Sequence, residues 1–481
     1  MTLAAWLDTL RREVFAHLAP SPTAPAPGLY TYPVALDGGQ RRIHLRVEAD
    51  GAGVLFADVT DAVHLNPTAV LMVKLALDGV PLAEAEQRVQ RGFSGVDVGQ
   101  LHRELAAMYE LVARFQAPVD CPTCAIDALV THRPLFSTPV NAPFKVDVAL
   151  TYACNNACAH CYNEPGRVTM PSLPLADWFR VFDRLAAIGV PHVILTGGEP
   201  TLLPDLPEIV RYADGLGHIV GMNTNGRRLA EIPLMAALAE AGLNHVQVTL
   251  EADRAAVHNA MVGADAFAET VGGIEAALDS GIHVITNTTL TRQNLERALP
   301  TIDFLHSLGL RTFAMNGIIH AGSGRGTPAA IPTTEMASLL SAVRERAATL
   351  DMRFLWYTVT EYCQFSPLAL DLDPKRCNAA EYSMCIEPNG DVLPCQSYYQ
   401  TAGNLLRDPW DAIWNSDLFL SFRERETRPG LPDECYTCLD LEMCGGGCPL
   451  ERAARVALAR PAERGCGRAR GERQGVPQGA R

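Results

Sequence analysis

The chain has 481 residues, a length that predicts several domains rather than one core. Apolar content of 48% and charged content of 20% are normal for a globular protein, and a net charge of −14 excludes a long-range field that attracts nucleic acid. No apolar run is long enough to span a membrane and no export signal is seen, so we expect a cytoplasmic protein whose 14 cysteines bind metal rather than form disulfides.

The N-terminal part of the chain predicts a helix and then a small separate domain. Residues 1–27 are expected to form an amphipathic helix and a linker. Residues 28–118 begin with short alternating segments at 29–36, 42–48 and 54–59, which predict a small sheet. Three helical patterns follow, and the first opens at Asn66 with a proline at the first helical position. The third repeats apolar residues on one face, namely Leu101, Leu105, Met108, Val112 and Phe115.

A small sheet followed by three helices describes a winged helix-turn-helix. The run Leu65-Asn-Pro-Thr-Ala69 resembles the PqqD-like domain, which binds leader peptides of ribosomally made, post-translationally modified peptides. DNA is the competing partner, but residues 28–116 carry 8 Lys and Arg against 11 Asp and Glu, a net of −3. We therefore expect residues 28–118 to bind a precursor peptide as an added strand, with no nucleic-acid partner.

The connector at 119–140 contains a pair of cysteines, Cys121 and Cys124. Two thiols alone do not complete a tetrahedral metal site, so a structural role is expected. Redox activity or a share in a metal site is the alternative.

Residues 141–350 alternate apolar runs with helical patterns. Six runs predict strands, at 145–150, 192–195, 218–222, 245–250, 283–290 and 311–315. Six βα units fit a partial (β/α)6 barrel of the α/β class, whose ligands lie at the carboxyl ends of the strands.

Three cysteines follow the first of these strands, at Cys154, Cys158 and Cys161. Three thiolates at spacings of four and three residues can hold one face of a 4Fe-4S cluster and leave the fourth iron open. Zinc is the alternative, and it would need a fourth ligand such as His160. A disulfide is disfavoured because three is an odd number of thiols.

A glycine motif follows the second predicted strand, where the apolar run stops at Gly197-Gly198-Glu199-Pro200. Two glycines at a strand end let the backbone approach a ligand closely. Taken alone, this sequence is a common turn. Gly197 lies 36 residues after Cys161, with one amphipathic helix between them, which is the length of one βαβ crossover.

The CxxxCxxC spacing followed by Tyr162, together with the downstream glycine motif, resembles the radical S-adenosylmethionine (SAM) enzymes. The resemblance implies that SAM occupies the open iron, that Gly197 to Glu199 bind its methionine amino group, and that its cleavage gives a 5′-deoxyadenosyl radical. Polar residues beside the cysteines and at strand ends become candidate SAM contacts, with strand-end capping as the alternative. These are Tyr162, Asn223, Asn225, Thr249, Glu251, Asn287 and Thr289. Thr249 and Glu251 stand where family members usually have Ser and Asp.

Residues 351–376 are expected to bridge to a cysteine-rich domain at 377–466, and Cys363 in the bridge reads as a buried inert thiol. Eight cysteines and Gly390 resemble the SPASM extension of peptide-modifying radical SAM enzymes. The resemblance implies two further 4Fe-4S clusters, one on Cys377, Cys385, Cys395 and Cys448 and the other on Cys435, Cys438, Cys444 and Cys466. Without Cys385, whose spacing varies in the family, the first of these would keep an open iron. A zinc ribbon on Cys435, Cys438, Cys444 and Cys448 would leave four cysteines unused. The tail at 467–481 is expected to be disordered.

These features together predict an enzyme that uses SAM and three 4Fe-4S clusters to abstract hydrogen from a precursor peptide, with an oxidative crosslink as the expected product. A reducing partner such as flavodoxin or ferredoxin is implied. One alternative is an anaerobic sulfatase-maturating oxidase, but those enzymes have an acidic residue where Gln396 follows Cys395. The other is a non-enzymatic iron-sulfur regulator that binds DNA through its winged helix.

Overall fold

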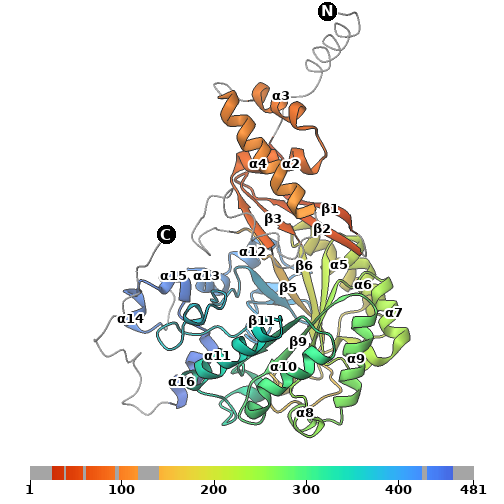
Figure 1. The fold of residues 1–481 in the computed structure, drawn as a ribbon, viewed down its shortest axis with the longest axis vertical. Coiled ribbons are helices and arrows are strands. Elements are labelled where there is room, and N and C mark those ends of the chain that lie inside the picture. The colour runs from red at the N-terminus through yellow and green to blue at the C-terminus, as the bar shows by residue number, and fades with distance from the viewer. Residues whose placement is uncertain are drawn as a thin grey trace, which may run out of the picture.

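In a computed structural model of the protein, residues 24–36, 39–57, 61–92, 97–116, 140–424 and 431–458 are described. The expectations for the N-terminal helix, for Cys121, Cys124 and Cys466, and for the C-terminal tail lie outside these residues. Figure 1 shows a small N-terminal domain set on a larger α/β body, with the helices α12 to α16 at one side of that body.

The N-terminal domain is a four-stranded antiparallel sheet in the order β1-β2-β3-β4, followed by three helices. The elements are β1 (Gly28–Leu36), β2 (Gly39–Val47), β3 (Gly53–Ala57), β4 (Asp61–Leu65), α2 (Pro67–Leu77), α3 (Leu82–Gly92) and α4 (Val98–Gln116). The three expected strands and three helices are present, while β4 was not predicted. Strand β4 has only five residues, and it is their pairing with β3 that makes them a strand. Asn66 caps α2 as expected, because its Oδ1 accepts from the Ala69 N–H at 2.8 Å.

Both faces of this small sheet are covered. Ile43 and Leu45 point to the helices and are fully buried in their core, and the buried face of α4 is the one predicted. His44 and Arg46 alternate with them and point to the opposite face. The His44 Nε2 lies 2.7 Å from the Gly217 carbonyl oxygen, and Arg46 donates to the Pro143 carbonyl at 3.1 Å.

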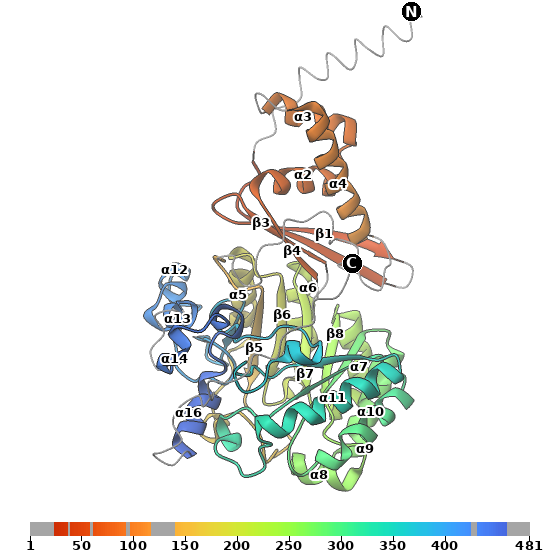
Figure 2. The ribbon, with the colours of Figure 1, turned by 60° about the vertical axis from the view of Figure 1, so that its left-hand side comes forward.

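These contacts fix where the N-terminal domain sits on the barrel. Pro143 precedes β5 and Gly217 precedes β7, so the domain packs against the amino-terminal ends of the barrel strands, as the turned view in Figure 2 shows. Arg46 is buried there beside Glu48, with 2.8 Å between Nε and Oε1. The N-terminal domain therefore lies at the end of the barrel opposite to the carboxyl ends of its strands.

Buried histidines near this interface make stability depend on pH. Burial lowers the pKa of His44 and of His245 from 6.5 to about 4. The unfolded chain takes up these protons first as the pH falls, so the contribution of His44 and His245 to stability should be constant above pH 6.5 and should fall from pH 6.5 to 4. The loss should be about 3 kcal/mol for each histidine. Urea unfolding midpoints at pH 7 and pH 4.5 measure it, and His44→Gln should lessen the difference; an equal difference in that variant would contradict this assignment.

The body of the protein is built on a ten-stranded sheet in the order β11-β10-β9-β8-β7-β6-β5-β12-β13-β14. Seven parallel strands form the barrel part: β5 (Lys145–Thr151), β6 (His192–Gly197), β7 (Ile219–Thr224), β8 (His245–Thr249), β9 (His283–Thr289), β10 (Thr312–Asn316) and β11 (Arg353–Trp356). The helices between them are α5 (Leu175–Ala187), α6 (Leu206–Gly215), α7 (Ile232–Glu240), α8 (Ala255–Val262), α9 (Phe267–Asp279), α10 (Ala298–Ser307) and α11 (Thr333–Thr349). The six predicted strands are confirmed with ends shifted by one or two residues, and β11 is an additional strand.

The cysteine-rich segment continues the same sheet on its other edge. Strand β12 (Ser383–Ile386) runs parallel to β5, and β13 (Asp391–Leu393) and β14 (Gly403–Asn404) add to it in antiparallel fashion. Short helices complete the segment: α12 (Trp410–Trp414), α13 (Asp417–Arg423), α14 (Asp433–Tyr436), α15 (Leu441–Cys444) and α16 (Pro449–Leu458). The barrel and the cysteine-rich segment thus share one sheet.

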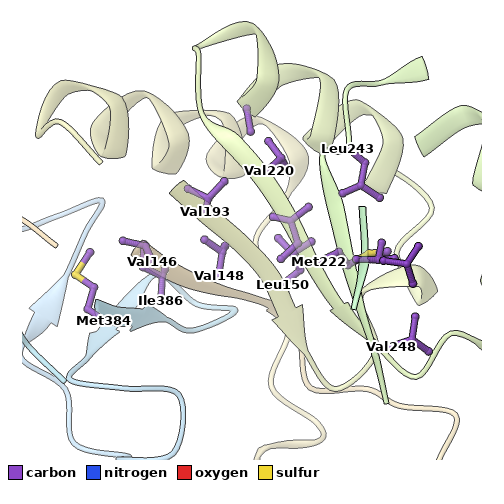
Figure 3. Packing of buried hydrophobic residues seen from close by; sticks show 14 of the residues in the cluster. Val146, Val148, Leu150, Val193, Val220, Met222, Leu243, Val248, Met384 and Ile386 are labelled. Carbon is purple, nitrogen blue, oxygen red and sulfur yellow. The ribbon is translucent and has the colours of Figure 1, made fainter. Parts of the chain in front are cut away.

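Alternation along the strands separates a core from a polar interior. Val146, Val148 and Leu150 of β5 are fully buried in the outer core, together with Met384 and Ile386 of β12 (Figure 3). The residues between them, such as Asp147 and Ala149, point to the opposite side of the sheet. Within the described parts of the chain, no helix has the length and apolar character needed to cross a membrane.

Candidate active site

The three cysteines of the predicted cluster lie in the loop that follows β5. Backbone hydrogen bonds anchor this loop to the end of α8, from the Ala157 N–H to the Val262 oxygen at 2.9 Å and from Ala159 to Met261 at 3.0 Å. Its far end is held by the Cys161 carbonyl, which accepts from the Ser323 N–H at 2.8 Å. The cysteine positions are therefore set by the fold and not by a metal alone.

The thiols of Cys154 and Cys161 lie within electrostatic range of Cys158. Cys154 is exposed, while Cys158 and Cys161 are half-buried. Burial raises the pKa of Cys158, and the charges of Glu251, Cys161 and Cys154 raise it further. Thiols with raised pKa values are protonated at neutral pH, so binding of a metal cluster to this loop would release their protons.

The arrangement fits a multi-iron cluster better than one zinc ion. Among the described residues, no three His, Cys, Asp or Glu side chains converge so as to hold a single ion. A cubane is bound through separate irons, so its thiolates need not converge on one point. His160 lies beside these cysteines, but its Nε2 is 2.9 Å from Glu251 Oε1, and this pairing occupies the fourth zinc ligand that the alternative required. Burial lowers the pKa of His160, but the Glu251 carboxylate more than offsets this and raises it.

The glycine motif contacts the cysteine loop directly. Gly197 has φ +132°, and a Cβ there would lie 2.0 Å from the Thr151 oxygen. A Cβ on Gly198 would lie 2.2 Å from the Ala153 oxygen. The Gly198 N–H donates to the Thr151 oxygen at 2.6 Å. The two glycines are therefore required for the β5 and β6 loops to meet, a close approach that only glycine permits.

Glu199 is fully buried, and its carboxylate is bound within the protein. Its Oε1 accepts from the hydroxyls of Thr201 at 2.6 Å and Thr224 at 2.7 Å, and its Oε2 accepts from the Asn225 N–H at 2.7 Å. Burial raises the pKa of this carboxyl, and these hydrogen bonds oppose the rise. The side chain therefore fixes the ends of β6 and β7 relative to one another, which leaves the main chain of the motif to meet a ligand.

Asn225 connects the end of β7 to the cysteine loop. Its Nδ2 donates to the Asn155 Oδ1 at 2.6 Å. Arg227, two residues later, donates to the Asn155 carbonyl oxygen at 2.6 Å. Sequence reasoning did not identify Asn155 or Arg227, because neither belongs to a motif with fixed spacing.

The other candidate contacts line the neighbouring strand ends. Thr249 and Asn287 are paired residues on β8 and β9, and Glu251 Oε2 accepts from the Thr289 N–H at 2.8 Å. The buried Oδ1 atoms of Asn287 and Asn316 have no hydrogen-bond partner among the described residues. Buried acceptors without partners are costly unless a ligand or water satisfies them, so these atoms fit a polar ligand such as SAM. Asn316 was missed, because it ends an apolar strand and carries no motif.

Tyr162 points from the cysteine loop toward the cysteine-rich segment. Its hydroxyl donates to the Gln396 Oε1 at 3.2 Å. Burial is the main cause that raises the pKa of Tyr162, so the hydroxyl remains a donor at neutral pH. The predicted SAM contact thus has a protein partner that the sequence did not indicate.

The first auxiliary set of cysteines is brought together from distant segments. Burial raises the pKa of Cys448 to about 11, with a further contribution from the charge of Cys377. Burial also raises the pKa of Cys395, with contributions from Cys377 and Cys448. Cys385 is fully buried on β12 opposite Leu393, and Cys395 contributes to the rise in its pKa. Cys377, Cys395 and Cys448 thus lie within electrostatic range of one another, and Cys385 lies within electrostatic range of Cys395.

The described members of the second auxiliary set lie on α14, on α15 and in the turn between them. The Cys438 N–H donates to the Cys435 carbonyl at 3.1 Å, which brings the two residues into one turn. Cys444 is buried, and its Sγ accepts from the Tyr362 N–H at 3.3 Å. Tyr362 belongs to the predicted bridging segment, so that segment packs on this set, and Cys363 next to it is half-buried. The fourth expected member, Cys466, lies beyond the described residues.

Two family models match the chain. The radical SAM superfamily matches residues 148–305, and the SPASM iron-sulfur cluster-binding domain matches residues 377–439. Mycofactocin maturase MftC from Mycobacterium ulcerans is 31% identical over 342 residues, which cover 68% of this chain and 87% of that protein. PqqA peptide cyclase from Streptomyces rochei is 28% identical over 340 residues, covering 68% and 90%.

The fold has solved counterparts. Streptococcus suis SuiB matches with a TM-score of 0.62 at 16% identity, over 85% of this chain and 95% of that one. SuiB bound to the precursor peptide SuiA matches with a TM-score of 0.63 over 88% and 96%. The structural match supports the fold, and the cysteine loop, the glycine motif and the sequence relatives agree on the family. The chain belongs to the radical SAM superfamily and carries a C-terminal SPASM domain, with iron-sulfur clusters and SAM as its cofactors.

Proposed function

We propose that the protein is a radical SAM enzyme that modifies a ribosomally synthesised precursor peptide, with an oxidative crosslink as product. One observation carries the proposal: the cysteine loop, the glycine motif and the auxiliary residue Gln396 meet at one end of the barrel through direct contacts. The relatives named PqqA peptide cyclase and mycofactocin maturase support a peptide substrate, as does the similarity to SuiB, which has been solved with its precursor peptide SuiA bound.

The reaction needs a site that holds SAM still and excludes water. When bound, the cluster and SAM supply the reductive cleavage that yields a hydrogen-abstracting radical. The protein's own part is positional: Gly197 and Gly198 let the backbone close on the ligand, and Glu199 fixes the strand ends behind them. Asn225 ties the end of β7 to the cysteine loop, the Oδ1 of Asn287 is a buried acceptor without a partner among the described residues, and Tyr162 faces the SPASM domain. An external one-electron donor such as flavodoxin or ferredoxin would start the cycle.

The proposed cofactor inventory is three 4Fe-4S clusters. Cys154, Cys158 and Cys161 hold the first. The second takes Cys377, Cys395 and Cys448 with Cys385, and the third takes Cys435, Cys438 and Cys444 with Cys466. Iron analysis of anaerobically purified protein should give about 12 irons per chain, at four for each cluster. A value near eight would remove one auxiliary cluster from the inventory.

The N-terminal domain is proposed to hold the leader of the precursor as an added strand. Both faces of its sheet are covered, which leaves the edges β1 and β4. Strand β1 carries Pro33, which has no N–H to donate, so β4 is the better edge for an incoming strand. Residues 28–118 would then act as a PqqD-like domain.

The position of this domain sets a minimum length for the substrate. Because the domain packs at the amino-terminal ends of the strands, a bound leader must send the modified residues past the barrel to the other end. Strands β5 and β6 have seven and six residues, about 20 Å, and with the loops the path is about 25 Å. An extended chain covers it with at least about eight residues.

Shortening the spacer tests this geometry. A precursor with about four spacer residues should bind with unchanged affinity but lose the two-hydrogen mass change that marks crosslinking. Fluorescence polarisation of the labelled peptide reports binding, and mass spectrometry reports modification. Equal modification of short-spacer and full-length peptides would contradict the placement of the leader at the N-terminal domain.

Specific residues argue against two alternative functions. A sulfatase-maturating oxidase would use an acidic group after Cys395, but Gln396 stands there, and its amide oxygen accepts from Tyr162 at 3.2 Å and is not a base at neutral pH. A DNA-binding regulator would need a basic winged helix, whereas residues 28–116 carry a net charge of −3 from 8 basic and 11 acidic residues. A salt-dependent DNA-binding assay separates the second alternative from the proposal.

A further inference from the structure

The residues that follow Cys161 and the residues that follow Cys395 contact one another. Tyr162 donates to Gln396, and Tyr399 donates back toward the cysteine loop. The Tyr399 hydroxyl lies 3.0 Å from the Asn163 Oδ1 and 3.3 Å from the Tyr162 carbonyl oxygen. A loop of the SPASM domain is thus hydrogen-bonded to Tyr162 and Asn163, the two residues that follow Cys161.

Asn163 is hydrogen-bonded both to Tyr399 and to the glycine motif. Its Nδ2 donates to the Gly197 carbonyl oxygen at 2.9 Å, while its Oδ1 accepts from Tyr399. An asparagine amide is planar and has one acceptor end and one donor end, so fixing the oxygen also orients the nitrogen. The hydrogen bonds therefore run without a break from Tyr399 through Asn163 to Gly197, and each has a fixed donor and acceptor. We call this series the Tyr399 relay.

The ring of Tyr399 is itself held in place. The Arg167 guanidinium lies 4.4 Å from the ring centre, and Arg167 is ion-paired with Glu387. Glu387 also accepts from the Tyr152 hydroxyl at 2.9 Å, and Tyr152 lies in the loop after β5. The Tyr399 hydroxyl is thus positioned by side chains from both the barrel and the SPASM domain.

We propose that Tyr399 is a positioning residue for SAM binding. Through Asn163, Tyr399 orients the carbonyl and the peptide plane of Gly197 in the glycine motif, which we call the SAM loop. The inference rests on the assignment of Gly197 to SAM binding. It makes the SPASM domain part of the SAM site, in addition to any role of its cysteines. Gly197 cannot compensate by moving toward Thr151, because the adjoining Gly198 N–H already donates to the Thr151 oxygen at 2.6 Å.

Tyr399→Phe removes only the hydroxyl and is the direct test. The reconstituted full-length enzyme is titrated with SAM without peptide, and the dissociation constant is measured by equilibrium dialysis. Loss of one hydrogen bond should weaken SAM binding roughly fivefold. The SAM-induced change in the electron paramagnetic resonance spectrum of the reduced enzyme should require correspondingly more SAM. Tyr398→Phe is the matched control, because the Tyr398 ring packs edge-on against Phe422 instead.

Asn163→Asp tests the second link on its own. The aspartate keeps an oxygen for Tyr399 but places an acceptor against the Gly197 carbonyl, so SAM binding should weaken more than in Tyr399→Phe. The double variant should lose no more than Asn163→Asp alone, because both changes break one chain. SAM affinity within twofold of wild type in Tyr399→Phe, or additive losses in the double variant, would overturn the proposal. A wild-type enzyme that binds SAM but leaves peptides unmodified would instead count against the proposed function. It would not contradict the proposed role of Tyr399 in SAM binding.

Discussion

Replacing Cys161 with alanine is expected to reduce SAM cleavage to the level of a no-enzyme control. Cys161 is one of three thiols of the loop after β5 that interact electrostatically, and its carbonyl also anchors the loop through Ser323. Two remaining cysteines leave a second iron without a protein ligand, so the cluster should not survive purification. The iron content should fall by about four per chain. Production of 5′-deoxyadenosine under strong reduction is the measurement.

Cys363→Ala is the matched control for this experiment. Cys363 is a half-buried thiol in the bridging segment and belongs to neither proposed auxiliary set. Its replacement should leave SAM cleavage and the iron content near wild type. If Cys161→Ala cleaved SAM as fast as Cys363→Ala, the loop at 154–161 would not hold the cluster that reduces SAM.

Gly198→Ala is expected to have the second largest effect. A Cβ at this position would lie 2.2 Å from the Ala153 oxygen and 2.6 Å from the Tyr152 oxygen, and backbone atoms on both sides cannot move aside as a flexible side chain can. The strand-end loops must separate, at a cost of about 1 to 3 kcal/mol in the free energy of unfolding. Because the same separation displaces the SAM loop, binding of SAM should be lost together with stability.

Gly215→Ala isolates the local effect of a methyl group. Gly215 ends helix α6, and a Cβ there meets nothing within 4 Å. The control should unfold at or slightly above the wild-type midpoint and should bind SAM normally. Calorimetric titration with SAM and denaturant unfolding of both variants give the comparison. Wild-type SAM affinity in Gly198→Ala would show that SAM binding does not need the close backbone approach at this glycine.

Much of the barrel was predictable because its strands are apolar runs that can be recognised from the local sequence alone. Val193, Ile194 and Leu195 form an apolar run that ends at glycines, and such a run needs no partner to be read as a buried strand. Strands β4, β11 and β12 were missed. Each has four or five residues, and it is their pairing with β3, β10 and β5 that makes them strands. Short segments of this kind depend on distant neighbours that spacing does not reveal.

The site divides in the same way. The cysteines and the glycine motif have fixed spacings, so their residue types and order predict their role. Asn316, Asn155 and Tyr399 have no such spacing, and they enter the site because three separate strand ends and a SPASM loop converge. The carboxylate of Glu199 shows the limit of motif reading, since its oxygens are bound by Thr201, Thr224 and Asn225 within the fold.

Deuterium transfer shows whether the radical formed at the cysteine loop takes its hydrogen from a peptide. The full-length enzyme would be incubated anaerobically with SAM, a reductant and a precursor peptide that is deuterated on its side chains. We expect deuterium from the peptide to appear in 5′-deoxyadenosine, in parallel with a change in the peptide. Release of 5′-deoxyadenosine without deuterium, from a peptide of unchanged mass and stereochemistry, would contradict the proposed function.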